Sequence, residues 1–453
     1  MTTHDKQTPI SKTPPSAGKD ETRTSAPLSL TARIILIVLG LLAPLLVLEI
    51  AVRVVGLAPP AQPNPSIWSE HPLFGWWHIP YSGGTFHSDY NEFVAEVNVN
   101  ARSLRDREIG YDNPDNAFRV LSLADSFGEA LQVDLDQTYH KQLESLLTQS
   151  LEQPVEVINA GVGGWGTDQE AIFYVAEGFR YEPDVVLLAF FIRNDAVNNY
   201  GPLEIERNGG SQQKAFFTLS PTGELIPPPV QEDVAEAEPA ALETNPQQVA
   251  SFDDEEAKPA LIGVADTLWT WSALYRFFMP YLRDIPPVVQ QLGPSGILGG
   301  EAVIRAKHPS VPIPFFVYQD PPDEQFEAAW SLTEAIILRL RAAVAERGSQ
   351  LVVVLVGAPE QLYPDAWERT LAANPQMQGL NLDIDAPNRR LNAFLSAEGI
   401  DHLDLLPIFR EAAAQPETPP LHFRHDQHWT PAGHRLAAEA IHQFLQDEDA
   451  THK

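Results

Sequence analysis

Five short apolar runs recur along the chain after residue 117, and each has the length of a β-strand. They cover residues 118–124, 155–162, 184–191, 351–359 and 402–407. Unbroken runs rich in valine and leucine are typical of strands that are buried on both faces of a sheet. We therefore expect about five parallel strands in the interior of one domain.

Segments with helical spacing of apolar residues alternate with these runs. They cover residues 137–150, 168–178, 326–347, 386–397 and 431–446. Strands that alternate with helices are typical of a parallel sheet whose two faces are covered by helices. The pattern therefore predicts an α/β fold.

The longest apolar run lies near the N-terminus, and it predicts a helix that crosses a membrane. Residues 34–48 carry no charge, and the run continues past Glu49. Its length lies between that of a signal-peptide core and that of a spanning helix. Because two prolines directly follow Ala58, no convincing cleavage site is present, and we expect an uncleaved transmembrane anchor over residues 29–57. A cleaved signal and a buried core helix are the alternatives.

Basic residues beside this run predict its orientation. Five Lys or Arg residues precede the run, whereas none occurs between Arg53 and Arg102. Short cytoplasmic flanks carry the excess of basic residues. We therefore expect a single-pass protein of the cell membrane, with residues 1–28 as a disordered cytoplasmic tail and the large domain outside the cytoplasm.

The rest of the chain divides into a lead-in, a main domain and an insertion. Residues 58–117 are expected to form a linker and a small β-rich lead-in, because residues 93–100 alternate between apolar and polar. Residues 118–453 are expected to form the main domain, interrupted at about 200–325. Within the insertion, residues 227–256 hold nine acidic residues and no basic one, which favours a solvated, flexible segment.

An aromatic-rich segment, residues 268–282, follows the acidic one. We interpret it as a helix that packs over the main domain. A lid on the substrate side or a contact with a membrane surface is the alternative.

The composition excludes several kinds of binding and catalytic site. The formal net charge is -31, from 61 acidic and 30 basic residues, which argues against binding to nucleic acid. The chain has no cysteine, which excludes disulfides, thiolate zinc sites and a cysteine nucleophile. We expect neither a cofactor nor a metal ion, and serine, histidine and carboxylates are left to carry the chemistry.

Two segments hold residues suited to nucleophilic catalysis. Ser126 comes just after the first apolar run, and ligands of open α/β sheets bind outside the carboxyl ends of the strands. Asp426 and His428 lie ahead of the last predicted helix, where the histidine could accept the serine proton while the acid orients its ring. A helix-capping role is the alternative for Ser126. A metal site is the alternative for the histidine cluster, whose members are His422, His425, His428 and His434, beside Asp426.

Two further segments follow predicted strands. Residues 159–167 are rich in glycine, which lets the backbone approach a ligand closely. Residues 190–199 contain asparagines, whose amides can donate to a developing oxyanion. Each segment alone could be an ordinary turn, but together with Ser126 they stand at the ends of three successive strands and describe one site.

In the order and spacing of these four blocks, the chain resembles the SGNH or GDSL-type hydrolases over roughly residues 93–210 and 326–446. The resemblance implies Ser126 as the nucleophile and His428 as the base. It implies an oxyanion hole made by Gly164, Asn194 and the backbone N–H of Ser126. It also implies a flavodoxin-like, three-layer α/β/α sandwich with a parallel sheet of about five strands.

The chain departs from the family pattern at three places. Ala124 and Ile192 stand where the family usually has glycine, and Arg193 precedes the asparagine. Asp426 lies two residues before the histidine, whereas His425 occupies the commoner position of the acid. In this respect the sequence DQHW is similar to the DxHW element of alginate O-acetyltransferases. Arg193 is either a structural residue or a contact for an anionic substrate.

These observations predict a serine-dependent esterase or deacetylase that acts outside the cytoplasm on acyl esters of carbohydrate. A polysaccharide O-acetyltransferase that uses the same residues is the first alternative, and it would need a membrane partner that delivers acyl groups. A non-catalytic envelope assembly protein is the second alternative.

Overall fold

The computed structural model describes residues 2, 29–208, 210–228, 259–307 and 313–447. The chain divides into two compact units, Met1–Ala51 and Val52–Lys453. Nearly all of the predicted cytoplasmic tail and of the predicted acidic segment lies outside the described residues.

The N-terminal apolar run forms helix α1 (Leu30–Val55), which has 26 residues. At about 1.5 Å per residue the helix is roughly 39 Å long, which exceeds the hydrocarbon thickness of a bilayer. Its mean hydropathy reaches 2.8, and it is the one helix among the described residues that is long and apolar enough to cross a membrane.

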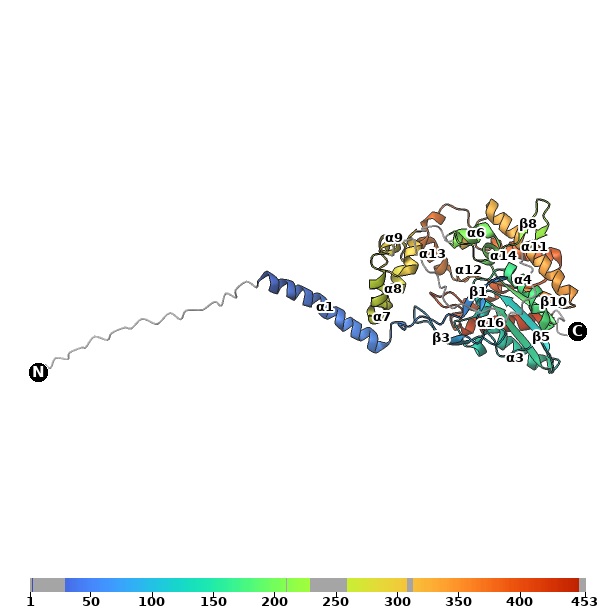
Figure 1. The fold of residues 1–453 in the computed structure, drawn as a ribbon, viewed down its shortest axis with the longest axis horizontal. Coiled ribbons are helices and arrows are strands. Elements are labelled where there is room, and N and C mark those ends of the chain that lie inside the picture. Colours follow the sequence, from blue (N-terminus) through green and yellow to red (C-terminus); the bar gives the residue numbers. More distant parts are fainter. Residues whose placement is uncertain (1, 3–28, 209, 229–258, 308–312, 448–453) are drawn as a thin grey trace. The chain divides into compact units, whose positions relative to one another are not determined.

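A five-stranded parallel sheet forms the centre of the second unit (Figure 1). Its strand order is β11-β10-β7-β5-β6. The strands are β5 (Phe118–Ala124), β6 (Val155–Gly161), β7 (Val185–Phe191), β10 (Gln350–Val356) and β11 (Asp401–Asp404). All neighbouring strands run parallel, so the predicted α/β fold with about five parallel strands is confirmed.

Helices cover both faces of this sheet. Because successive side chains of a strand point to opposite faces, each strand contributes to two hydrophobic cores. In β5, Leu121 and Leu123 enter one hydrophobic core, while Val120 and Ala124 enter the other. The first core is completed by α4 (Thr167–Ala176), α11 (Glu324–Glu346) and α14 (Ala386–Glu398). The second is completed by α3 (Tyr139–Leu151), α15 (Leu405–Ala413) and α16 (Pro431–Asp447).

The last predicted strand is shorter than expected. The apolar run 402–407 continues past β11, but the side chain of Asp404 accepts a hydrogen bond from the backbone N–H of Leu406 and caps α15. Leu405 and Leu406 therefore face the core from a helix. Periodicity alone could not separate a short strand from the helix that directly follows it.

The predicted lead-in contains two antiparallel strand pairs. They are β1 (Trp68–His71) with β2 (Gly75–His78) and β3 (Gly83–His87) with β4 (Val94–Asn98). Phe74 and Trp77 belong to the core beside the sheet, so the lead-in packs on the main domain.

The aromatic-rich segment forms two helices rather than one, α7 (Ile262–Trp271) and α8 (Ala273–Arg283). With α9 (Pro286–Leu292) and α10 (Gly300–Lys307) they surround a small core of their own. The remaining described helices and strands are α2 (Ser126–Glu129), α5 (Asp195–Asn199), α6 (Gly201–Arg207), β8 (Thr218–Leu219), β9 (Leu225–Ile226), α12 (Pro359–Leu362) and α13 (Pro364–Ala373).

Arg119 connects the lead-in to the sheet. Only 1% of its side chain is exposed, and its Nε donates to Glu156 at 2.8 Å. Its Nη atoms donate to the backbone carbonyls of Tyr111, Asp112 and Tyr181 at 2.7 to 2.9 Å. One buried guanidinium thus satisfies acceptors from three segments of the chain.

We predict that Arg119→Met lowers the free energy of unfolding by about 3 to 5 kcal/mol, because it leaves buried acceptors without a donor. Urea denaturation of the full chain in detergent measures this change. The control is Arg341→Met, whose side chain is 42% exposed beside Glu398 and should contribute less than about 1 kcal/mol. Equal effects of the two substitutions would contradict the prediction.

Candidate active site

Ser126 lies just after the carboxyl end of β5, an interior strand of the sheet, as the first residue of the short helix α2. Asp125 caps this helix, and its Oδ1 accepts a hydrogen bond from the backbone N–H of Phe127 at 2.8 Å. Ala124, which replaces the usual glycine, is the last residue of the extended strand, a backbone conformation that alanine adopts without strain. The turn therefore presents Ser126 at the edge of the sheet.

Two glycines allow α2 to lie close to β6. A Cβ atom on Gly128 would stand 2.3 Å from the Cβ of Ala124, and one on Gly161 would stand 2.4 Å from the backbone nitrogen of Glu129. Only glycine fits at such separations. Gly161, the last residue of β6, thus also fixes the position of the helix that carries Ser126.

His428 and Asp426 extend from Ser126 in one chain of hydrogen bonds. The Nε2 of His428 lies 2.8 Å from the Oγ of Ser126. The Nδ1 of His428 lies 2.8 Å from the Oδ1 of Asp426. His425, which occupies the commoner position of the acid, instead stacks on Tyr90 with ring centroids 4.3 Å apart. This geometry suits a serine nucleophile, a histidine base and an acid that orients the base.

Asp426 and His428 stabilise each other's charged forms. Burial lowers the pKa of His428, but the hydrogen bond and the charge of Asp426 outweigh burial and raise that pKa above 6.5. Burial raises the pKa of Asp426, but its bonds to His428 outweigh burial and lower that pKa below 3.8. At neutral pH Asp426 is therefore ionised and able to stabilise a protonated His428.

The residues around His428 hold its loop in place. Trp429 is 2% exposed and packs against Phe127, whose ring centroid also lies 5.0 Å from that of His428. Gln427 adopts a positive φ of 73°, and its Oε1 accepts a hydrogen bond from Arg193 at 2.7 Å. The Nη1 of Arg193 also lies 3.3 Å from Glu360. Arg193 thus bridges two segments, which supports the structural interpretation of this residue.

Asn194 lies beside the residue that precedes the nucleophile. Its Nδ2 donates to the Oδ2 of Asp125 at 3.2 Å. The next residue, Asp195, accepts a hydrogen bond from the backbone N–H of Phe191 at 2.8 Å and so closes the turn after β7. Burial raises the pKa of Asp125 and of Asp195, so these carboxyl groups take up protons more readily than exposed ones.

Gly164 lies on the loop between β6 and α4, with a positive φ of 78° that favours glycine. Its carbonyl accepts a hydrogen bond from Asn198 of α5 at 2.9 Å. The carbonyl of the preceding Gly163 accepts one from the indole of Trp76 at 2.9 Å. The loop of Gly164 is thus connected to the helix that begins after Asn194.

Glu92 is a functional candidate that the sequence analysis missed. Its carboxylate accepts hydrogen bonds from the backbone N–H groups of Arg424, His425 and Asp426 at 2.8 to 3.1 Å. The lead-in therefore holds the loop that carries Asp426 and His428. Glu92 belongs to no block of the family pattern, and only its position before the alternating residues 93–100 could have drawn attention to it.

The C-terminal histidines have separate environments. Burial lowers the pKa of both His422 and His434 to about 3. The Nδ1 of His434 accepts a hydrogen bond from the backbone N–H of Tyr139 at 3.3 Å. In the described part of the chain, no group of three or more His, Asp or Glu side chains is arranged to hold a metal ion.

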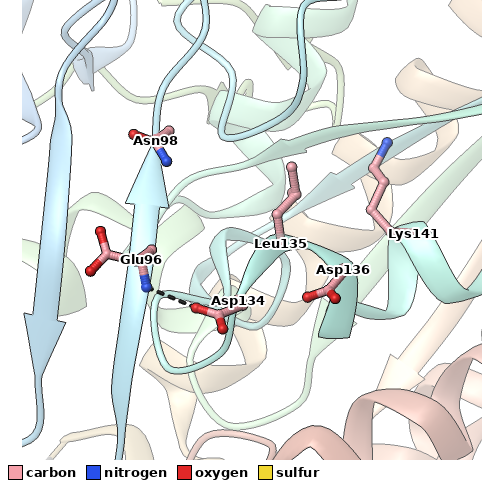
Figure 2. A pocket seen from close by; sticks show the side chains of 6 residues that line it. All are labelled: Glu96, Asn98, Asp134, Leu135, Asp136 and Lys141. Carbon is pink, nitrogen blue, oxygen red and sulfur yellow. Dashed lines mark hydrogen bonds between the residues drawn. The ribbon is translucent and has the colours of Figure 1, made fainter.

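A hollow of about 510 Å³ lies beside the loop that follows α2 (Figure 2). Its lining residues are Glu96, Asn98, Asp134, Leu135, Asp136 and Lys141. Figure 2 shows the hydrogen bond of 2.8 Å from the backbone nitrogen of Glu96 to Asp134, which joins β4 to this loop. None of the candidate catalytic residues lines the hollow, so we assign the chemistry to the neighbourhood of Ser126 instead.

Comparison with protein families gives one match for the C-terminal part of the chain. Residues 316–453 match the model of a family described as an SGNH hydrolase-like domain, acetyltransferase AlgX. The matched segment contains Asp426 and His428, while Ser126 lies before it. No curated protein sequence matches the chain.

Several solved structures are similar at low sequence identity. They include an acetyl xylan esterase (12% identity, covering 71% of this chain and 97% of that one, TM-score 0.34) and a GDSL-like lipase from Bacteroides thetaiotaomicron (10%, 75% and 93%, TM-score 0.32). A two-domain esterase active on acetylated mannans shares 12% identity over 73% of this chain and 49% of that one, with a TM-score of 0.30. Similarity at this level supports no argument about the substrate.

The family match confirms the resemblance to the SGNH hydrolases that the sequence motifs indicate. The matched segment covers less than half of the chain, and it agrees with the predicted enzyme that acts on ester bonds, either as a hydrolase or as an acyltransferase.

Proposed function

We propose that this protein is a serine-dependent O-acyltransferase that modifies carbohydrate hydroxyl groups outside the cytoplasm. The observation that carries the proposal is the hydrogen-bonded series Ser126, His428 and Asp426. The match of residues 316–453 to an acetyltransferase family favours transfer over the hydrolysis that the sequence placed first.

In the first half of the reaction, the Oγ of Ser126 attacks the carbonyl carbon of a donor ester while the Nε2 of His428 takes the serine proton. The oxygen of the tetrahedral intermediate is stabilised by the Ser126 N–H, the Gly164 N–H and the Asn194 amide. The intermediate then expels the donor alcohol, which receives the proton from His428. The acyl group remains as an ester on Ser126.

In the second half, a hydroxyl group of the acceptor attacks this ester. His428 takes the proton of the acceptor hydroxyl and returns it to Ser126 when the new ester leaves. Ionised Asp426 stabilises the protonated histidine in both halves. Atoms balance because one ester is consumed and one ester is formed.

The proposal also includes anchoring of the protein by α1 and an orientation in the membrane. Helix α1 is apolar and long enough to cross a membrane, and the basic residues before it favour a cytoplasmic N-terminus. The site would then face exported or envelope carbohydrate. A transferase in this position also requires an acyl donor that is available at the outer face of the membrane.

Hydrolysis is the second candidate, because the same acyl-serine reacts with water if no acceptor is bound. A single assay separates the two functions: the full chain in detergent receives a labelled acetyl ester with and without an O-deacetylated polysaccharide. A transferase moves label to the polysaccharide faster than it releases free acetate. Faster release of acetate would instead identify a hydrolase.

We predict that Ser126→Ala nearly abolishes both reactions, because the acyl group then has no nucleophile to receive it. Asn194→Ala should lower kcat by roughly a hundred- to a thousand-fold, the usual effect of losing one oxyanion donor. The activity of both variants is measured by release of p-nitrophenol from p-nitrophenyl acetate. If wild type neither releases p-nitrophenol nor acquires label on Ser126, the non-catalytic alternative is correct.

We predict that activity depends on a group that must lose a proton, with a pKa above 6.5, because His428 acts as a base only when neutral. Activity should therefore fall as the pH drops through this pKa. Asp426→Asn should shift this acid limb to lower pH, because the main contribution that opposes the effect of burial on the pKa of His428 is then lost. It should also decrease kcat by up to about ten-thousand-fold. The pH profile of kcat/KM measures both; an unshifted limb argues against Asp426 as the partner of His428.

We predict that Glu92 acts as a positioning residue. Glu92→Gln removes the charge and one acceptor from the loop of residues 424–426 and should lower kcat by roughly ten- to a hundred-fold, since hydrogen bonds to charged groups contribute about 1.5 to 3 kcal/mol. KM should change little. The matched control is Glu96→Gln, on the exposed face of β4, which should leave kcat unchanged. A rise in KM at constant kcat would show that Glu92 acts on substrate binding instead.

A further inference from the structure

Exposed apolar side chains are concentrated in one part of the second unit, the helices α7 to α9. Isolated exposed apolar residues are normal on a protein surface, whereas a concentration of them marks an interaction site. Seven large apolar side chains with at least 39% exposure lie between residues 261 and 292, and Trp271 reaches 74%. We call them the apolar patch; its members are Leu261, Val264, Trp271, Phe278, Tyr281, Ile285 and Leu292.

The opposite side of these helices is already occupied. Met279 and Val289 enter the small core shared with α10, and Arg276 is only 9% exposed. Phe278 and Tyr281, three residues apart on α8, therefore point away from that core, at 47% and 39% exposure. The residues of the patch thus lie on the outside of a folded part of the chain, and Tyr281 also packs edge-on against Tyr90 and His425.

The chain leaves α1 directly beside this patch. The last residues of α1, from Val52 onward, belong to the same compact unit as the sheet. Within that unit, the guanidinium of Arg53 donates to the backbone carbonyl of Trp271. The Nε of Arg276 donates to the carbonyl of Pro59 at 2.8 Å. These bonds fix the apolar patch next to the outer end of α1.

The same end of α1 is connected to the catalytic loop through two adjacent residues. The amide of Asn91 donates to the carbonyl of Gly56 at 2.9 Å, while Glu92 binds the backbone of residues 424–426. Adjacent Cα atoms are only about 3.8 Å apart. Tyr90 adds a third contact, since it stacks on His425 and its hydroxyl donates to Asp284 at the end of α8 at 2.9 Å.

We propose that the apolar patch docks on the bilayer surface beside the point where α1 leaves the membrane, and that this contact holds the catalytic loop at the membrane surface. The proposal rests on the anchoring by α1 described under the proposed function. A helix that spans the bilayer places Arg53 at the boundary, and Trp271 must then lie at the same depth because it is bonded to Arg53. Tryptophan and tyrosine are enriched at this boundary, where their rings meet lipid and their polar atoms meet water.

Docking also limits which substrates reach the site. A site fixed at the membrane surface meets acyl donors or acceptors that are themselves held by lipid more often than it meets free oligosaccharides. The bilayer explains the patch better than a second copy of the chain, because bilayer contact follows from the position of Arg53 alone.

Site-specific fluorescence tests the proposal, and the absence of cysteine from the natural chain makes single labelling sites simple to create. The variants Trp271→Cys and Phe278→Cys of the full chain, each labelled with a thiol-reactive fluorophore, are placed in proteoliposomes. Lipids with a nitroxide near the headgroup or along the acyl chain, and aqueous iodide, serve as alternative quenchers. Leu45→Cys reports on α1, and Val175→Cys, 49% exposed on α4, reports on a surface away from the patch.

The expected result is that the lipid nitroxide quenches the probes at Leu45, Trp271 and Phe278 but not at Val175, with ester hydrolysis retained in all variants. Quenching at Leu45 alone, with iodide access at Trp271 and Phe278, would overturn docking and leave anchoring intact. Protection of the patch from both quenchers would show that protein covers it and would also overturn docking. A probe at Leu45 that only iodide quenches would overturn anchoring and docking together, whereas the catalytic proposal would stand or fall on the acyl-transfer assay.

Discussion

The hydrogen bond between His428 and Ser126 is the interaction on which the site depends, and it joins residues 302 positions apart in sequence. No local preference of the chain can create such a contact. It forms because β5, an interior strand of the sheet, ends two residues before Ser126, while contacts with Trp429, Arg193 and Glu92 hold the loop of His428. Both packing and polar contacts thus orient the imidazole ring of His428. In the proposed mechanism, this orientation decides whether the ring can accept the proton of Ser126.

The lead-in takes part in the site rather than only connecting it to the anchor. Trp68 and His78 both contact the carboxylate of Glu129, the last residue of the nucleophile helix, at 2.7 Å. Trp76 binds the glycine loop, and Glu92 binds the histidine loop. Three separate segments of the candidate site are therefore held by one small β-rich element, which supplies rigidity that loops alone would lack.

The sequence predicts the sheet well because the five apolar runs are strong and continuous, and the motif order places Ser126, His428 and Asp426 in one site. Contacts that depend on the shape of the fold, or on residues far apart in the sequence, could not be predicted from these patterns. The break between β11 and α15 depends on one capping aspartate, Asp404. The roles of Glu92 and Arg193 depend on which loops become neighbours after folding, and no spacing rule encodes that. The separation of the C-terminal histidines likewise appears only when His434 reaches Tyr139.

The carboxylate of Glu92 accepts its hydrogen bonds from the histidine loop through main-chain N–H groups. Such bonds do not depend on which side chains residues 424 and 425 carry. Arg424 is exposed, so evolution or an engineer can vary its side chain while the loop keeps its path. The main chain thus preserves the geometry of the candidate site, whereas the exposed side chain of Arg424 can change without altering it.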